Sequence, residues 1–306
     1  MHVACMKKSL LFLFGLAVLT VAAQAQAGTA PLRIVTSFLP ISAATLSIVG
    51  DRAEVSQLTG QGVGPHEFEP KPSDLRKIAD ADLLIVNGLG LEGWLDAVVH
   101  KIGNSHLKVI DASVGIAPLE NPTELKLSGP SDAKTADGAN PHAWLDPVLA
   151  KQQAATILQA VAAADPANAA YYAANAQAYF AKLDQLNADY AAELAKLPSR
   201  DLITFHDAFP YFAARYGLNY LGSVEEFPEK APSPRELGHL VDLINAHHVR
   251  VVFAEEGYEP KLLQTIAEQT GAQLAQIDTL EVGPASADGY LERMRSNLAV
   301  LQKAWQ

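Results

Sequence analysis

A long helical stretch near the middle of the chain separates two halves that carry the same pattern of short elements. Over residues 166–197, apolar side chains recur at spacings of three and four residues, with one spacing of seven, and alanines fill much of the remainder. Such spacing predicts an amphipathic helix, and alanine favours helix more than any other residue. This helix would be about 48 Å long, which is longer than a crossover helix within one sheet requires. We therefore expect one long rigid helix that joins two lobes.

Short strands alternate with helices on both sides of this stretch. The strands are expected at 32–37, 53–58, 82–87 and 108–111 in the first half, and at 201–205, 218–224, 250–254 and 273–277 in the second. Alternation of this kind is typical of mostly parallel sheets covered by helices. The predicted fold class is α/β, with a four-stranded sheet flanked by helices in each lobe. The expected boundaries are 28–164 for the N-terminal lobe, 165–198 for the linking helix and 199–306 for the C-terminal lobe.

The first 27 residues have the pattern of a cleaved export signal. Two lysines precede an apolar run at 10–21, and a small-residue cleavage site ends at Ala27. The apolar run is too short for a spanning helix, and translation could begin at Met1 or Met6. A lipoprotein signal needs a cysteine after its apolar run, whereas Cys5 lies before it. We therefore expect a periplasmic protein without a lipid anchor.

The mature chain is acidic and lacks cysteine. Removal of the two signal lysines changes the formal net charge from −11 to −13. This charge argues against nucleic acid as a partner and suits a cationic ligand. Without cysteine there are no disulfides, no thiolate metal ligands and no cysteine nucleophile.

Four side chains that can bind a metal follow the predicted strands. His66 comes after the second strand, and His142 follows the fourth through the loop at 118–140. His206 ends the first strand of the second half, and Asp278 ends the last strand. Ligands of open α/β sheets bind outside the carboxyl ends of the strands. A cleft between the lobes would therefore bring these four residues together.

Three imidazoles and one carboxylate are suitable ligands for Zn²⁺, at about 2.0–2.2 Å from the ion. They could also hold Mn²⁺, which binds more weakly at a given site. A catalytic zinc normally keeps one position for water, so a site filled by His66, His142, His206 and Asp278 would hold the ion without using it. Glu255 also stands at a strand end, where it could orient a ligating histidine or simply face the cleft.

Simpler interpretations exist for each of these residues. A lone histidine at a strand end is more often hydrogen-bonded or exposed than a ligand, and aspartate after a strand is ordinary turn chemistry. Placement at four equivalent strand ends favours the metal site. The remaining histidines of the mature chain lie in or beside predicted helices and loops away from the strand ends, and they are His100, His106, His239, His247 and His248. Adjacent residues on a helix face different ways, so we expect His247 and His248 to be solvated.

Five segments, together with the export signal, resemble the periplasmic solute-binding proteins of zinc and manganese ABC importers, the metal-binding cluster A-I family. The segments are PHEFEP at 65–70, NPHAWLDP at 140–147, FHDAF at 205–209, FAEE at 253–256 and ID at 277–278. The resemblance implies two α/β lobes joined by a long helix, with one metal ion between the lobes. It assigns the ligands to His66, His142, His206 and Asp278.

The third ligand position bears on the choice of metal. In this family, zinc members mostly have histidine there and manganese members tend to have glutamate, so His206 favours zinc. Many zinc members also carry a histidine-rich loop before the second motif. Residues 118–139 contain no histidine, which leaves manganese open.

We expect a monomeric protein, not an enzyme, that captures a divalent metal, most simply Zn²⁺, with high affinity in the periplasm. It would deliver this metal to an inner-membrane ABC permease. A manganese or dual Zn²⁺/Mn²⁺ carrier of the same family is the first alternative. A metal-dependent hydrolase, with water in place of one ligand, is a more distant one. An adhesin-like surface protein with an incidental metal is the third.

Overall fold

The first half of the chain forms a parallel four-stranded sheet. The strands are β1 (Leu32–Thr36), β2 (Ala53–Gln57), β3 (Leu83–Val86) and β4 (Lys108–Asp111), in the order β2-β1-β3-β4. β3 has the sequence LLIV and all four of its residues are buried, as expected for a strand covered on both faces. The connecting helices are α1 (Leu39–Val49), α2 (Pro72–Ala79) and α3 (Leu95–Ile102).

The second half repeats this plan. Its strands are β5 (Asp201–Thr204), β6 (Asn219–Ser223), β7 (Val251–Glu255) and β8 (Gln273–Ile277), in the parallel order β6-β5-β7-β8. Each sheet therefore places its first and third strands in the centre. The helices of this half are α6 (Pro210–Tyr216), α7 (Pro234–His247), α8 (Lys261–Thr270) and α9 (Gly289–Ala304).

The structure, a computed structural model, describes residues 30–60, 62–119, 139–224, 233–256 and 261–306. Every element named here lies in one unit, from Pro31 to Gln306. The expected signal at 1–27 and most of the loop at 118–140 lie outside the described residues. Among the described helices, none has both the length and the apolar composition needed to cross a bilayer.

Two long helices connect the halves. α4 (Pro147–Ala164) begins after Asp146, whose carboxylate accepts a hydrogen bond from the N–H of Val148 at 2.8 Å. A 3₁₀ turn, η3 (Pro166–Asn168), then leads into α5 (Ala169–Leu194). The predicted helix at 166–197 is thus shorter at both ends, because the first residues form the tighter turn and the α-helix ends at Leu194.

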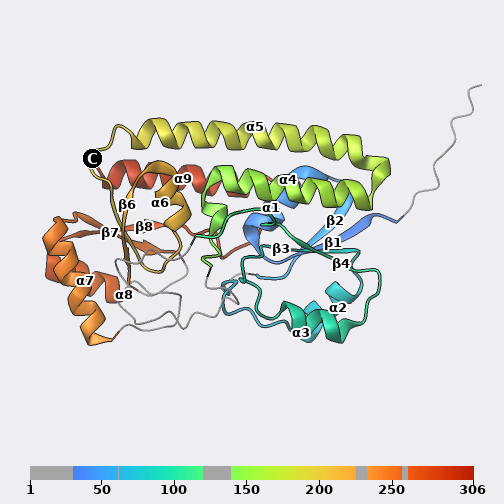
Figure 1. Ribbon diagram of the computed structural model, residues 1–306, viewed down its shortest axis with the longest axis horizontal. Coiled ribbons are helices and arrows are strands. Elements are labelled where there is room, and N and C mark those ends of the chain that lie inside the picture. The colour runs from blue at the N-terminus through green and yellow to red at the C-terminus, as the bar shows by residue number, and fades with distance from the viewer. Residues whose placement is uncertain (1–29, 61, 120–138, 225–232, 257–260) are drawn as a thin grey trace, which may run out of the picture. The chain divides into compact units, whose positions relative to one another are not determined.

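α5 packs against elements of both halves (Figure 1). Its apolar stripe is buried, and Tyr172 and Tyr190 are fully covered. Asn175 donates to the carbonyl of Ile48 in α1 at 3.1 Å, and the Tyr190 hydroxyl donates to the carbonyl of Met294 in α9 at 2.5 Å. One apolar cluster includes residues of both sheets and of α5. The predicted α/β class, with two parallel four-stranded sheets and a long linking helix, is confirmed.

Candidate metal centre

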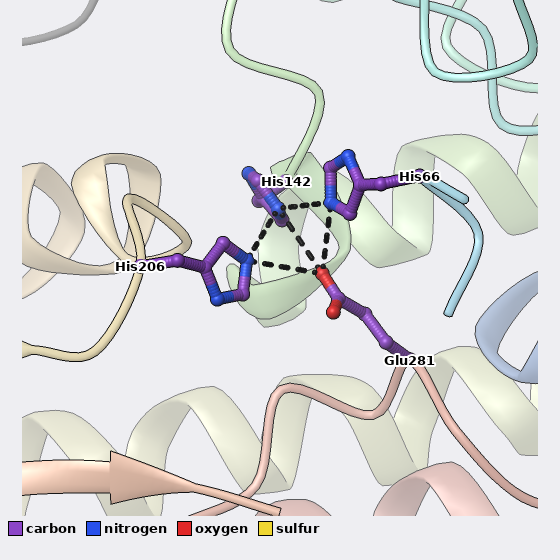
Figure 2. A group of neighbouring side chains, drawn as sticks. All are labelled: His66, His142, His206 and Glu281. Atoms are coloured by element: carbon purple, nitrogen blue, oxygen red, sulfur yellow. Dashed lines mark hydrogen bonds and ion pairs between the residues drawn. The ribbon is translucent and has the colours of Figure 1, made fainter. Parts of the chain in front are cut away.

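Three histidines and one glutamate from four distant parts of the chain meet at one point (Figure 2). The residues are His66, His142, His206 and Glu281, and one donor atom of each lies within 4.8 Å of the others. His66 follows β2, His142 precedes the 3₁₀ turn η2 (Ala143–Leu145), and His206 follows β5. Glu281 lies in the loop after β8. The structure thus brings together the three histidines that the sequence predicted.

The distances between the donor atoms match the spacing of ligands around a small ion. The Nε2 atom of His142 lies 3.1 Å from that of His66 and 3.1 Å from that of His206. The Oε1 atom of Glu281 is 3.1–3.3 Å from all three nitrogens. In a tetrahedron with bonds of about 2.0–2.1 Å, adjacent ligand atoms are about 3.3 Å apart. Where all three Nε2 atoms carry lone pairs, these lone pairs repel one another, and a metal ion among them would relieve that repulsion.

Asn140 determines how the ring of His142 presents its Nε2 atom. The Asn140 Oδ1 atom accepts hydrogen bonds from the backbone N–H and from Nδ1 of His142, at 3.0 and 2.9 Å. The amide nitrogen of Asn140 donates to the carbonyl of Asp207 at 2.7 Å, and that of Asn87 donates to the carbonyl of Pro141 at 3.0 Å. Burial lowers the pKa of His142 to about 3, so its ring stays neutral, as metal binding requires.

Glu255 orients His206 in the same way. One carboxylate oxygen accepts the backbone N–H of His206 at 3.0 Å, and the other pairs with its Nδ1 atom. Glu255 ends β7, which lies beside β5. Burial opposes protonation of His206, but the charges of Glu255 and Glu281 raise its pKa well above the usual value. Glu255 therefore contacts the Nδ1 side of His206, opposite the Nε2 atom that faces the group, and is not itself a member of the group.

His66 is the most exposed member of the group. Its side chain is 16% accessible, against 3% for His142 and 0% for His206 and Glu281. His66 comes after the glycine-rich segment that follows β2. The centroid of its ring lies 5.1 Å from that of the His142 ring. Solvent therefore reaches the group from the side of His66.

Asp278, which the sequence predicted as the fourth ligand, is not a member of this group. It has other partners, and Glu281 lies with the three histidines instead. Both carboxylate oxygens of Asp278 pair with the guanidinium of Arg293 in α9. The Oδ1 atom also accepts the N–H of Leu280 at 2.7 Å. This bond starts a turn, and three residues further on Glu281 points back to the histidines (Figure 2).

A local signal for this arrangement is present in the sequence. Asp278, directly after a strand, is a residue that bonds the backbone two positions on, so its carboxylate is occupied. Glu281 then stands between Leu280 and Val282, and an acidic residue flanked by apolar neighbours is a candidate for a buried role. Burial acts to raise the pKa of Glu281, but His206, His66 and His142 together hold it well below the usual value.

The loop that carries Glu281 is hydrogen-bonded to the first half of the chain. The indole N–H of Trp144 donates to the carbonyl of Thr279 at 2.8 Å. The Gln57 amide donates to the carbonyl of Gly283 at 2.9 Å and accepts the N–H of Ala285 at 3.1 Å. These contacts fix both sides of Glu281 relative to β2 and η2.

Three aromatic side chains near the site are buried, and the other described histidines lie elsewhere. Trp144 is fully buried, with its ring centroid 4.9 Å from that of His142, while Phe205 and Phe209 are 6% and 1% exposed. The remaining described histidines are exposed, and they are His100, His106, His239, His247 and His248. The exposure of His247 and His248 agrees with the prediction.

Several known metal-binding proteins are similar to this chain. The chain is 33% identical over 276 residues to the high-affinity zinc uptake system protein ZnuA of Bacillus subtilis, covering 89% of this chain and 86% of that protein. It is 29% identical over 272 residues to the manganese-binding lipoprotein MntA of Halalkalibacterium halodurans, covering 87% and 86%. A Zn(II)-bound variant of AdcAII from Streptococcus pneumoniae has a similar structure, with a TM-score of 0.80 and 32% identity over 90% of this chain and 99% of that one.

The family model described as "Zinc-uptake complex component A periplasmic" matches residues 34–304. These include both sheets except for Leu32 and Arg33, the linking helices and all four residues of the group. This chain therefore belongs to the ZnuA family, the periplasmic solute-binding components of zinc and manganese ABC importers.

Proposed function

We propose that this protein captures a divalent transition metal, by preference Zn²⁺, between its two sheets and delivers it to an inner-membrane ABC permease. The observation that carries the proposal is the convergence of His66, His142, His206 and Glu281 at 3.1–3.3 Å spacings. Each histidine presents Nε2, and for two of them a hydrogen-bond partner on Nδ1 supports that orientation. Such partners behind a ligating histidine are typical of metal sites.

The arrangement suits holding an ion rather than catalysis. Four protein donors complete a tetrahedral shell, whereas a hydrolytic zinc keeps a position for water. The side chains of His142, His206 and Glu281 are almost fully buried, which leaves little space for a substrate beside the metal. The family consists of transporter components and not of enzymes. Neither the site nor the family therefore supports the hydrolase alternative.

The donor set favours zinc over manganese. Three imidazole nitrogens and one carboxylate in a tetrahedral arrangement suit Zn²⁺, while Mn²⁺ prefers more oxygen ligands and a higher coordination number. Named relatives include both a zinc and a manganese protein. A manganese or dual carrier is therefore the second candidate.

The organisation of the mature protein completes the proposal. Cleavage after Ala27 would leave a monomer in the periplasm, with an N-terminal lobe at 28–164, a linking helix at 165–198 and a C-terminal lobe at 199–306. The position of Cys5 before the apolar run supports a protein without a lipid anchor. The mass of the N-terminal peptide of the purified periplasmic form would test both the cleavage and the anchor.

The function is tested by metal competition on the metal-stripped mature protein. Zn²⁺ and Mn²⁺ are titrated separately near neutral pH against a calibrated chelator, with the exposed His239→Ala variant as a matched control. One tight zinc equivalent, lost in His142→Ala and retained in His239→Ala, is the expected result. Tight manganese binding would favour the second candidate, and no stoichiometric binding of either metal would overturn the site.

A further inference from the structure

Arg293 holds both ends of the loop that carries Glu281. Its Nε and Nη2 atoms pair with the two carboxylate oxygens of Asp278, before Glu281 in the chain. Its Nη1 atom donates to the carbonyl of Val282, directly after Glu281, at 2.7 Å. A single guanidinium thus fixes the residues on both sides of the carboxylate. The planar fork of arginine is suited to this because it supplies several donors in a rigid geometry.

Asp278 also makes hydrogen bonds to the turn itself and to α9. Its Oδ1 atom accepts the N–H of Leu280 at 2.7 Å. Its own N–H donates to Oδ1 of Asn297, and its carbonyl accepts from the amide nitrogen of Asn297, at 2.9 and 2.6 Å. Asp278 is therefore tied to α9 through Asn297 as well as through Arg293.

The turn that these bonds stabilise is a strained one. Leu280 has a φ of +61°, in the left-handed region that leucine rarely adopts. Its side chain is fully buried, so the backbone cannot relax by turning the side chain into solvent. Released from Asp278, the backbone at Leu280 would favour an extended conformation, which would displace Glu281 from the three histidines.

We propose that Asp278 and Arg293 form a clamp that positions Glu281 as the fourth metal ligand. They act through the conformation of residues 279–282 and do not touch the ion. This inference rests on the proposed metal capture. A ligand held in place before the ion arrives binds it more tightly, because ordering of the loop is already complete. Removal of the clamp should therefore weaken metal binding only where Glu281 is present to be positioned.

The test is a double-mutant cycle on the mature protein with Zn²⁺ as the probe. Arg293→Gln and Asp278→Ala are each made in the native background and in a Glu281→Gln background, and dissociation constants are measured by chelator competition. In the native background each should weaken zinc binding by about 10-fold or more. In the Glu281→Gln background the same changes should have less than about a 2-fold effect, because the charged carboxylate that they position is absent.

The two variants separate positioning from simple electrostatics. Arg293→Gln removes a positive charge and Asp278→Ala removes a negative one, so a long-range effect on a cation would have opposite signs. The clamp predicts weaker binding in both. Arg295→Gln, an exposed arginine on the same helix, is the matched control and should bind zinc as the native protein does. The visible absorption of bound Co²⁺, which reports coordination number, should change in both clamp variants and not in Arg295→Gln.

Three results would overturn the clamp while leaving metal capture intact. These are unchanged zinc affinity in both variants, effects of opposite sign, and equal losses in the two Glu281 backgrounds. A lower melting temperature of the apo protein with none of the affinity changes would assign the pair a purely structural role. Absence of zinc binding by the native protein would instead refute the proposed function.

Discussion

Substitution of Glu255 by glutamine tests whether the orientation of His206 determines zinc affinity. The native carboxylate accepts from two donors of His206, the backbone N–H and the Nδ1 atom. Glutamine has the same shape but a single acceptor oxygen, so one donor of His206 would face an NH₂ group. The ring of His206 would lose its charged partner, and its orientation would be less firmly fixed. Loss of such a partner typically lowers metal affinity by about 10–100-fold, or about 1.4–2.7 kcal/mol.

The assay is chelator competition with Zn²⁺, accompanied by thermal unfolding of the apo protein. Glu268→Gln, an exposed carboxylate on α8, makes the same chemical change far from the ligands and should leave affinity unchanged. The shorter substitution Glu255→Asp keeps the charge but reduces the reach of the side chain, and we expect an intermediate loss. Equal zinc affinity in Glu255→Gln and the native protein would refute the reasoning, since His206 would then need no partner on Nδ1.

Three further perturbations address the ligands and the scaffold. His206→Ala should weaken zinc binding by more than about 100-fold while the far-UV circular dichroism of the apo protein stays unchanged. Burial raises the pKa of Glu92 from 4.5 to about 7, so the folded state holds the protonated form more tightly than the unfolded state. Its contribution to stability should therefore be lost as pH rises from about 4.5 to about 7, by up to about 3 kcal/mol. Urea unfolding at pH 5 and pH 8 should show this loss in the native protein and not in Glu92→Gln. Gly88→Ala should destabilise the fold by about 1–3 kcal/mol in the same assay, because Gly88 has a φ of +83° and a Cβ would lie 1.9 Å from Oδ1 of Asp111.

The repeated sheet and the three histidines could be predicted because each depends on local pattern and one topological rule. Strands such as β3 are apolar throughout, and the carboxyl ends of parallel strands meet at one edge. His206 stands two residues after the end of β5, so its position relative to the strand was enough to predict its place.

The fourth member of the group depended on contacts that the strand rule does not describe. The rule selects Asp278 because it directly follows β8. Arg293 on α9, which lies 15 positions further along the chain, occupies that carboxylate instead. The turn at Leu280 then redirects the backbone so that Glu281 reaches the histidines. A side chain in a loop is placed by tertiary partners, and its distance from the strand end does not determine its direction.

The hydrogen bonds of the Glu281 loop connect the four residues of the proposed metal site unequally to the two halves of the chain. Although Glu281 comes late in the chain, its loop is bonded to Gln57 and Trp144, on the same side as His66 and His142. His206 is held instead by Glu255 on the second sheet. The loop is also bonded to α9 of the second half through Asp278 and Arg293. A movement that separates the sheets would therefore have to break one of these two sets of hydrogen bonds. Within the proposed site, Glu281 is thus the residue whose loop is bonded to both halves of the chain, whereas His66 and His142 belong to the first half and His206 belongs to the second.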